Sequence, residues 1–310
     1  MSDQAEQSST ADLDAQLAQG KKDVNSAYAR YVLFVLIVVY IFNFIDRQII
    51  SILAEEIKAD LGIGDAEIGF LYGTAFAIFY AVFGIPLGKL ADVWNRKSLI
   101  AIGLSFWSLM TALSGFAKSY TGLAICRFGV GVGEASATPA AFSMLSDYFS
   151  PRVRATVLAI YSSGIYIGAG IGLFLGGAVV EAGYAWYPDP SLAPLGIKPW
   201  QAAFLTVGLP GLFVAVWVWT IKEPIRGASE GLLTSPHPTP FKATQNTLFS
   251  VLPGLSLFTL YNAGGIRAVL ENLVALAIIS ALFLVFYTLM PTALQWIALG
   301  AGVYITVSWV

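Results

Sequence analysis

The sequence predicts an all-α membrane protein that crosses the bilayer several times. Of its 310 residues 57% are hydrophobic and 12% are charged, and its mean hydropathy is +0.72, whereas ordinary soluble domains carry about 25% charged residues. The apolar residues form continuous runs of membrane length, without the alternation of a β-barrel strand. The first run contains an acid and a base, Asp46 and Arg47. An ionisable side chain at that depth costs about 3 kcal/mol, which favours a polar, water-accessible pathway between the helices.

Six apolar runs occupy the chain up to residue 221, and each is long enough for one membrane-spanning helix. They cover residues 31–53, 67–90, 98–117, 121–144, 155–180 and 201–221. The fifth run carries glycines at spacings of four, which predicts close packing against a neighbouring helix. Its glycines are Gly164, Gly168, Gly170, Gly172, Gly176 and Gly177. Residues 1–26 are rich in Asp, Glu, Gln and Ser and lack the pattern of a signal peptide, so we expect a disordered cytoplasmic tail.

The remainder of the chain predicts a linker and part of a second set of helices. Residues 222–247 are polar and rich in proline, which indicates a cytoplasmic linker. Residues 248–265 are apolar but short, and we expect an interfacial helix there rather than a span. Two tight runs, 272–290 and 292–310, follow on either side of Pro291, giving about eight transmembrane helices in all. Because the chain stops inside apolar sequence, we expect a truncated product.

Basic residues in the short loops predict that the N-terminus lies in the cytoplasm, where such loops carry the excess of Lys and Arg. The predicted cytoplasmic side holds Lys21, Lys22, Arg30, Arg96, Lys97, Arg152, Arg154, Lys222, Arg226 and Lys242. The opposite side holds only Lys58, Lys118 and Lys198, and its first loop is acidic.

Four charged residues in the first and fourth runs are predicted to surround one cavity. At 1.5 Å per residue, Asp46 lies about 22 Å beyond Tyr31, and Arg127 lies about 9 Å inside the opposite surface, so the two share a level. Glu134 follows Arg127 by two helical turns on the same face, and Asn43 shares a face with Arg47. We expect Asp46 to pair with Arg127, and Arg47 with Glu134 in one conformation. A proton on either acid would break a pair and act as a switch; the alternative is a set of structural salt bridges.

The loop between the second and third runs has its own pattern, GKLADVWNRK, from Gly88 to Lys97. Gly88 permits close helix packing, and Asp92 can face a helix N-terminus. Arg96 and Lys97 would anchor the loop at the cytoplasmic surface. On charge alone, a plain positive loop explains the pattern equally well.

Three motifs together resemble the major facilitator superfamily. GKLADVWNRK resembles the loop signature of that superfamily, with Asn95 where the family usually has Gly. RFGVGVGEA, at 127–135, is similar to its fourth-helix motif, and SDYFSPRVRATVLAIY, at 146–161, is similar to its next loop. NFIDRQIIS, the Gly-Glu-Ala at 133–135 and SDYFSPRVRA look most like the Spinster branch. The resemblance covers residues 31–221.

The resemblance implies an alternating-access carrier with two six-helix halves around a central cavity. Residues 27–221 would form the N-terminal transport half, and residues 248–310 would be the start of an incomplete C-terminal half or an inserted hairpin. Spinster-type carriers move amphiphilic lipids such as lysolipids or sphingoid phosphates, and their bacterial members are thought to be proton-driven. Asp46 and Glu134 would couple protons, without any other cofactor. Carried over to this chain, the cavity would be lined by Asn43, Asp46, Arg47, Arg127 and Glu134, and the cytoplasmic gate would hold Gly88, Asp92, Arg96, Lys97, Asp147 and Arg154. We expect a monomer in a plasma membrane or bacterial inner membrane.

Other classes remain as alternatives or are disfavoured by composition. A drug or sugar-acid transporter of another branch is the main alternative, and a channel or non-transporting receptor comes next. An intramembrane enzyme or a metal site is disfavoured, because the chain has one cysteine, Cys126, and one histidine, His237. The net charge of −2 argues against a nucleic-acid partner.

Overall fold

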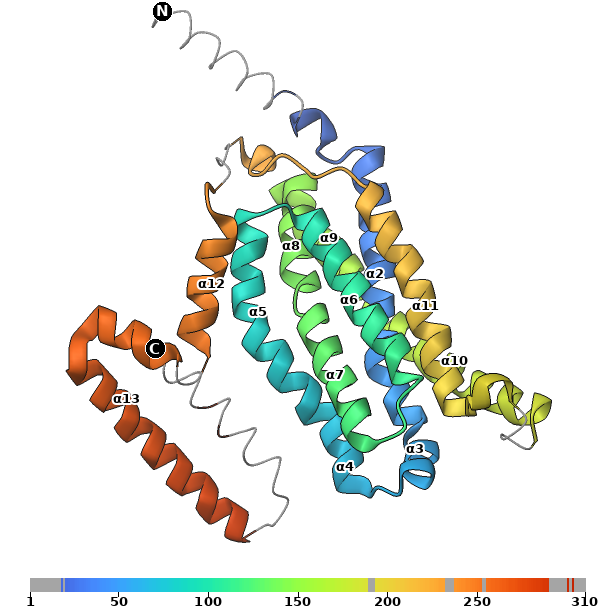
Figure 1. Ribbon diagram of the computed structural model, residues 1–310. Coiled ribbons are helices and arrows are strands. Elements are labelled where there is room, and N and C mark those ends of the chain that lie inside the picture. Colours follow the sequence, from blue (N-terminus) through green and yellow to red (C-terminus); the bar gives the residue numbers. More distant parts are fainter. Residues whose placement is uncertain are drawn as a thin grey trace, which may run out of the picture.

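The computed structural model describes residues 18, 20–188, 193–231, 237–252, 255–289, 300 and 303. Every regular element in these ranges is helical, which confirms the predicted all-α class. Figure 1 shows a bundle of long helices, with α12 along one side and α13 extending away from it. Six helices among the described residues are long and apolar enough to cross a membrane.

Three of the predicted spans are single helices with nearly the predicted bounds. They are α2 (Ala27–Ile52), α6 (Arg96–Ser114) and α11 (Pro199–Thr220). Side chains and prolines mark where they begin: Ser26 accepts a hydrogen bond from Ala29 N, Asn95 accepts one from Ser98 N, and Pro199 occupies the first turn of α11.

The other three spans are interrupted helices. The second comprises α4 (Asp65–Gly69), a π-helical turn η1 (Phe70–Thr74) and α5 (Ala75–Val93). The fourth comprises α7 (Tyr120–Glu134) and α8 (Ala137–Tyr148), which lie end to end in Figure 1. The fifth comprises α9 (Pro151–Ser162) and α10 (Gly164–Trp186). A short helix α3 (Ala54–Leu61) follows α2.

The glycines of α10 let it lie directly on α2, and only those at the predicted spacing of four do so. A Cβ on Gly168 would lie 2.6 Å from the Ile41 carbonyl oxygen, and one on Gly172 would lie 3.2 Å from Ile45 Cα. By contrast, a Cβ on Gly170 would meet nothing within 4 Å. Close backbone packing of this kind replaces the hydrophobic drive that lipid does not supply.

The apolar core forms two clusters, and the charged residues lie between them. Along α2, residues up to Tyr40 belong to one cluster and residues from Ile45 onwards to the other; along α7, Leu123 and Val130 divide in the same way. Asn43, Asp46 and Arg127 occupy the boundary between the clusters. This position places them in the middle of the bundle, away from both ends.

Beyond α11 the structure corrects two predicted boundaries. The linker contains a 3-10 turn, η4 (Ala228–Glu230), and its last residues already belong to α12 (Pro240–Val251), which begins with a first-turn proline. Residues 248–265 are therefore not one interfacial helix, because α12 ends at Val251 and α13 (Leu255–Leu289) begins at Leu255. Gly265, with a φ of 66°, bends α13. The predicted run 272–290 lies in α13 except for its last residue, and the run 292–310 lies outside the described residues apart from 300 and 303.

The expected disorder does not extend to the end of the N-terminal segment. Residues 1–17 and 19 lie outside the described residues, but residues 20–23 are helical. Asn25 N donates to the Tyr148 carbonyl at 2.9 Å, and Asn25 Nδ2 donates to Ser150 Oγ at 3.1 Å. These bonds fasten the start of α2 to the end of α8.

Candidate functional site

Helices α2 and α7 bring the predicted charged residues together in the middle of the bundle. Asn43, Arg127 and Glu134 are fully buried, and Asp46 is 1% exposed. We call Asn43, Asp46, Arg47, Arg127 and Glu134 the charged centre. Two acids and two bases meet there, so the charges balance and the cost of burying each is lower.

Arg47 forms the one direct ion pair among the residues of the charged centre, with Glu134 as expected. Its Nε donates to Glu134 Oε2 at 2.7 Å, and its side chain is 26% exposed. The guanidinium also lies over three aromatic rings, with its Cζ 5.0 Å from the centroid of Phe44, 4.6 Å from Phe76 and 4.8 Å from Tyr80. A cation held by an acid and three ring faces is fixed in position while one side remains open.

The expected pairing of Asp46 with Arg127 is wrong in this conformation. Arg127 Nη1 donates to the main-chain oxygen of Asp46 at 3.3 Å, and not to its carboxylate. The reason is geometric: a shared depth sets the level of two side chains but not the direction in which each one points. The Asp46 carboxyl instead lies beside Thr111 of α6.

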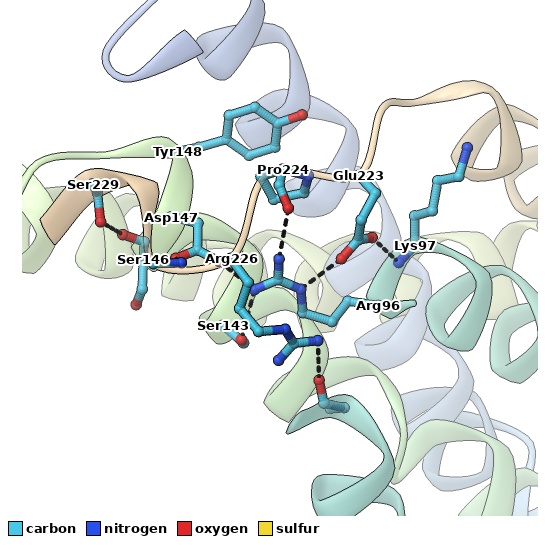
Figure 2. Close-up of polar contacts among 12 residues, drawn as sticks. Arg96, Lys97, Ser143, Ser146, Asp147, Tyr148, Glu223, Pro224, Arg226 and Ser229 are labelled. Atoms are coloured by element: carbon cyan, nitrogen blue, oxygen red, sulfur yellow. Dashed lines mark hydrogen bonds and ion pairs between the residues drawn. The ribbon is translucent and has the colours of Figure 1, made fainter. Parts of the chain in front are cut away.

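At the end of the bundle where α5 ends and α6 begins, Arg96 is the centre of a second polar cluster (Figure 2). Although it lies at the head of a helix, Arg96 is fully buried. Its Nη1 donates to Asp147 at 2.5 Å and to Ser143 at 2.9 Å, and its Nε donates to Glu223 at 2.7 Å. Its Nη2 donates to the Pro224 carbonyl at 3.0 Å. One guanidinium thus joins α6, α8 and the segment after α11.

Five further hydrogen bonds hold the segment after α11 at this end of the bundle. Arg226 Nη2 donates to the carbonyls of Ala91 and Trp94, at 3.0 and 2.8 Å. Gly227 N donates to Asp147 Oδ1 at 2.9 Å. Arg154 donates to Glu230 at 2.9 Å and to Ser229 at 3.2 Å. We call residues 222–231, with Arg96, Asp147 and Arg154, the basic-end cluster.

The remaining predicted gate residues take a smaller part in this cluster. Lys97 N donates to Glu223 Oε2 at 2.9 Å, and its Nζ donates to the Trp219 carbonyl at 3.3 Å. Asp92 is exposed and makes no hydrogen bond with the described residues. A Cβ on Gly88 would lie 4.0 Å from Pro139, an ordinary contact, so close packing does not require glycine there.

Comparison with known proteins agrees with this architecture. Residues 36–309, most of the chain, match the Major Facilitator Superfamily. The chain belongs to the major facilitator superfamily. It is 34% identical to protein spinster homolog 1 of Xenopus tropicalis over 208 residues, which is 66% of this chain and 37% of that protein. It is also 35% identical to an MFS-type efflux pump of Mycolicibacterium smegmatis over 181 residues, 58% of this chain and 39% of the pump.

A solved structure gives the same result for the fold. It is the crystal structure of a bacterial homologue of the human lysosomal transporter Spinster, in an inward-facing and occupied conformation. The identity is 37% and the TM-score is 0.61, with 66% of this chain and 47% of that chain covered. This superfamily member is therefore Spinster-like, and it matches less than half the length of each of these three proteins.

Sequence reasoning missed several polar residues that lie in the basic-end cluster or beside the charged centre. Glu223, Arg226 and Glu230 are part of the basic-end cluster, and Thr111 lies beside Asp46. The signal that could have found Glu223 and Arg226 was the charged sequence Lys-Glu-Pro-Ile-Arg, which directly follows the sixth apolar run. At that point the chain is back at the basic end of the bundle. Asn95, the departure from the loop signature, caps α6 through its bond from Ser98 N.

Burial shifts the pKa of Arg226, which belongs to the basic-end cluster, and of Tyr148, which lies beside it. The pKa of Arg226 is lowered by burial and by the nearby Arg96 guanidinium. The pKa of Tyr148 is raised, first by burial, and its hydroxyl donates to the Lys222 carbonyl at 2.9 Å.

Among the described residues, no group of three His, Cys, Asp or Glu side chains could hold a metal ion. The chemistry available at both sites is proton binding and anion pairing.

Proposed function

We propose that this chain belongs to a proton-coupled secondary active transporter that moves an amphiphilic organic solute, a lysolipid or sphingoid-type lipid, by alternating access. The observation that carries the proposal is the Arg47–Glu134 ion pair. It places a fully buried acid against a base that is still partly open and that is lined by aromatic rings. Membership of the superfamily and the similarity to protein spinster homolog 1 support transport, and the lipid class of the solute rests on the resemblance of the chain's motifs to the Spinster branch.

The charged centre suggests how solute and proton compete. While Glu134 is ionised, it holds the Arg47 guanidinium. A proton on Glu134 removes that charge and frees Arg47 to pair with an anionic head group, for which a planar guanidinium is well suited. The rings of Phe44, Phe76 and Tyr80 then offer apolar and π surface to the neighbouring part of the solute. Asp46 is the second proposed proton site, and Arg127 is the second proposed anion binder.

We propose that the gate on the cytoplasmic side lies at the basic-end cluster and involves Gly88, Asp92, Arg96, Lys97, Asp147 and Arg154. This assignment rests on the excess of basic residues at that end, which also supports a cytoplasmic N-terminus. Residues 27–221 would be one half of the carrier, and residues from 248 onwards would begin the second half. We propose a monomer in a plasma membrane or bacterial inner membrane.

Drug export is the second candidate function, favoured by the 35% identity to the mycobacterial efflux pump. Under this alternative the aromatic rings around Arg47 would bind a hydrophobic drug. The proton-coupling role of Asp46 and Glu134 would be unchanged, so the two candidates differ only in their solute.

Uptake into proteoliposomes tests the proposal and separates the two candidates. The purified chain is reconstituted, a pH gradient is imposed, and accumulation of a fluorescent lysolipid, a cationic drug and a sugar acid is followed. We expect saturable, gradient-driven movement of the lysolipid that is lost in Asp46→Asn and Glu134→Gln. Uptake of the drug instead would favour the alternative. Wild-type rates in both variants would overturn the proton-coupling assignment.

A further inference from the structure

The charged centre contains buried polar atoms that have no protein partner. They are Asn43 Nδ2 and Oδ1, Asp46 Oδ1, Thr111 Oγ1, Arg127 Nε and Nη2, and Glu134 Oε1. Their residues come from α2, α6 and α7, and all are at most 1% exposed. A buried polar atom without a partner costs about 1–3 kcal/mol, so a cluster of them in one place calls for an occupant.

Contacts of their residues bring these atoms together in pairs. Arg127 bonds to the main chain of Asp46 at 3.3 Å. Thr111 lies beside the Asp46 carboxyl, and Asn43 lies beside Glu134, although neither pair meets hydrogen-bond geometry. One turn before Thr111 on α6, the fully buried Trp107 also has an indole Nε1 without a protein partner. Each acid thus has one neutral polar side chain beside it, Thr111 at Asp46 and Asn43 at Glu134.

The balance of donors and acceptors identifies the chemistry of the occupant. Asn43 Nδ2 and the two Arg127 nitrogens can only donate, whereas Asn43 Oδ1 and the two carboxylate oxygens accept; the Thr111 hydroxyl does both. A metal cation would satisfy the oxygens but would face the Arg127 guanidinium and the amide N–H groups. An anion would face two acids. Water donates and accepts, and it typically makes about three hydrogen bonds when buried.

We propose that the charged centre holds ordered water molecules, and that Asn43 and Thr111 are positioning residues that hold this water between Asp46 and Glu134. The inference deepens the proposed function and rests on it for its purpose, since the water would connect the two proposed proton sites. Transfer needs no other reactant. The Asp46 carboxyl gives its proton to a water oxygen, and that water releases one of its own protons to the Glu134 carboxylate.

The surrounding charges are consistent with such a path. Arg47 and Arg127 face the acids from α2 and α7, and the Tyr80 phenol faces Arg47 from α5. The side chains that α6 brings to the site, Thr111 and Trp107, are neutral. Thr111 is therefore the residue whose hydroxyl can be removed without changing the charge of the centre.

Infrared difference spectroscopy on the full chain in nanodiscs tests the inference without requiring transport. Spectra are recorded at a pH where the Asp46 and Glu134 carboxyls are protonated and at a pH where they are ionised, in ordinary water and in water labelled with heavy oxygen. We expect water O–H stretching bands that shift with the oxygen isotope. Thr111→Val should lose at least one of them, and Thr111→Ser should keep it. Ser114→Ala is the matched control, because this buried hydroxyl of α6 donates to the Met110 carbonyl of its own helix.

Two outcomes would overturn the inference. One is a wild-type spectrum with no isotope-sensitive water band, a result that stands even if Thr111→Val fails to fold. The other is a folded Thr111→Val whose water bands equal those of wild type. Failure of the proposed function has a separate signature, because it would appear as normal pH-driven uptake in Asp46→Asn and Glu134→Gln, whatever the water bands show.

Discussion

Arg47 Nε lies 2.7 Å from Glu134 Oε2, and this contact joins α2 to α7 at the boundary between the two apolar clusters of the bundle. The two partners are unequal, because Glu134 is fully buried whereas the Arg47 side chain is 26% exposed. A pair of this kind can be opened from one side. That asymmetry is the basis of the proposed exchange between proton and solute.

Breaking this pair from one side should destabilise the protein more than removing both partners. We expect Glu134→Leu to lower the free energy of unfolding by about 3 kcal/mol, because it leaves the Arg47 charge uncompensated. The double variant Arg47→Met, Glu134→Leu should recover part of that loss. Unfolding in detergent–SDS mixtures measures both values. If the losses in the single variants Glu134→Leu and Arg47→Met add up to the loss in the double variant, the two residues are not energetically coupled.

Arg96 should be intolerant of lysine. It donates to four acceptors in different directions, and a lysine ammonium cannot reproduce that planar arrangement. We expect Arg96→Lys to cost about 3 kcal/mol of unfolding free energy, the cost typical of disrupting a buried ion pair. Arg152→Lys is the matched control, because Arg152 is exposed and forms no ion pair with the described residues. If Arg96→Lys leaves the free energy of unfolding unchanged, the hydrogen bonds of the Arg96 guanidinium contribute no stability.

The glycines of α10 should differ sharply in what they tolerate. Gly168→Ala places a Cβ 2.6 Å from the Ile41 carbonyl oxygen, so α10 must move away from α2. We expect a loss of about 1–3 kcal/mol, typical of overpacking. Gly170→Ala, with nothing within 4 Å, should be neutral or stabilising by up to about 1 kcal/mol. Thermal unfolding in detergent compares the two, and a similar midpoint in both variants would contradict the packing described here.

Tyr148 should make stability depend on alkaline pH. Burial raises its pKa in the folded protein, whereas the unfolded chain titrates near the ordinary value of about 10. The stability contributed by the neutral phenol is therefore complete below about pH 10 and falls as the pH rises above it. The difference in unfolding free energy between wild type and Tyr148→Phe should be constant below that pH and narrow above it. A difference independent of pH would show that the phenol does not titrate on unfolding.

The helices could be predicted from the sequence because lipid imposes a simple rule. Any segment that crosses the bilayer must be apolar for a fixed length, so the run of residues 31–53 yields α2 almost directly. The breaks inside the spans are harder, since η1 contains no proline, and the junction between α7 and α8 is marked only by Pro139 in the first turn of α8. Residues 248–265 were misjudged because apolar content does not reveal where α12 ends and α13 begins.

The charged centre could be predicted in composition and in one of its contacts, the Arg47–Glu134 ion pair, but not in the other. Charges inside apolar runs single out Asp46, Arg47, Arg127 and Glu134, because each is costly in lipid. Which acid meets which base depends on helix rotation, so the expected Asp46–Arg127 pair was wrong. Thr111 is an ordinary residue in an apolar run, and only the packing of α6 against α7 reveals its place beside Asp46.

Proton exchange on ligand binding tests the central claim most directly. Calorimetric titration of the purified chain with a lysolipid, repeated in buffers of different ionisation enthalpy, gives the number of protons taken up per molecule bound. If Glu134 must release Arg47 before an anionic head group can bind, binding will take up protons in wild type and none in the variant Asp46→Asn, Glu134→Gln. Binding that takes up no protons in wild type, or the same number in both, would contradict the account.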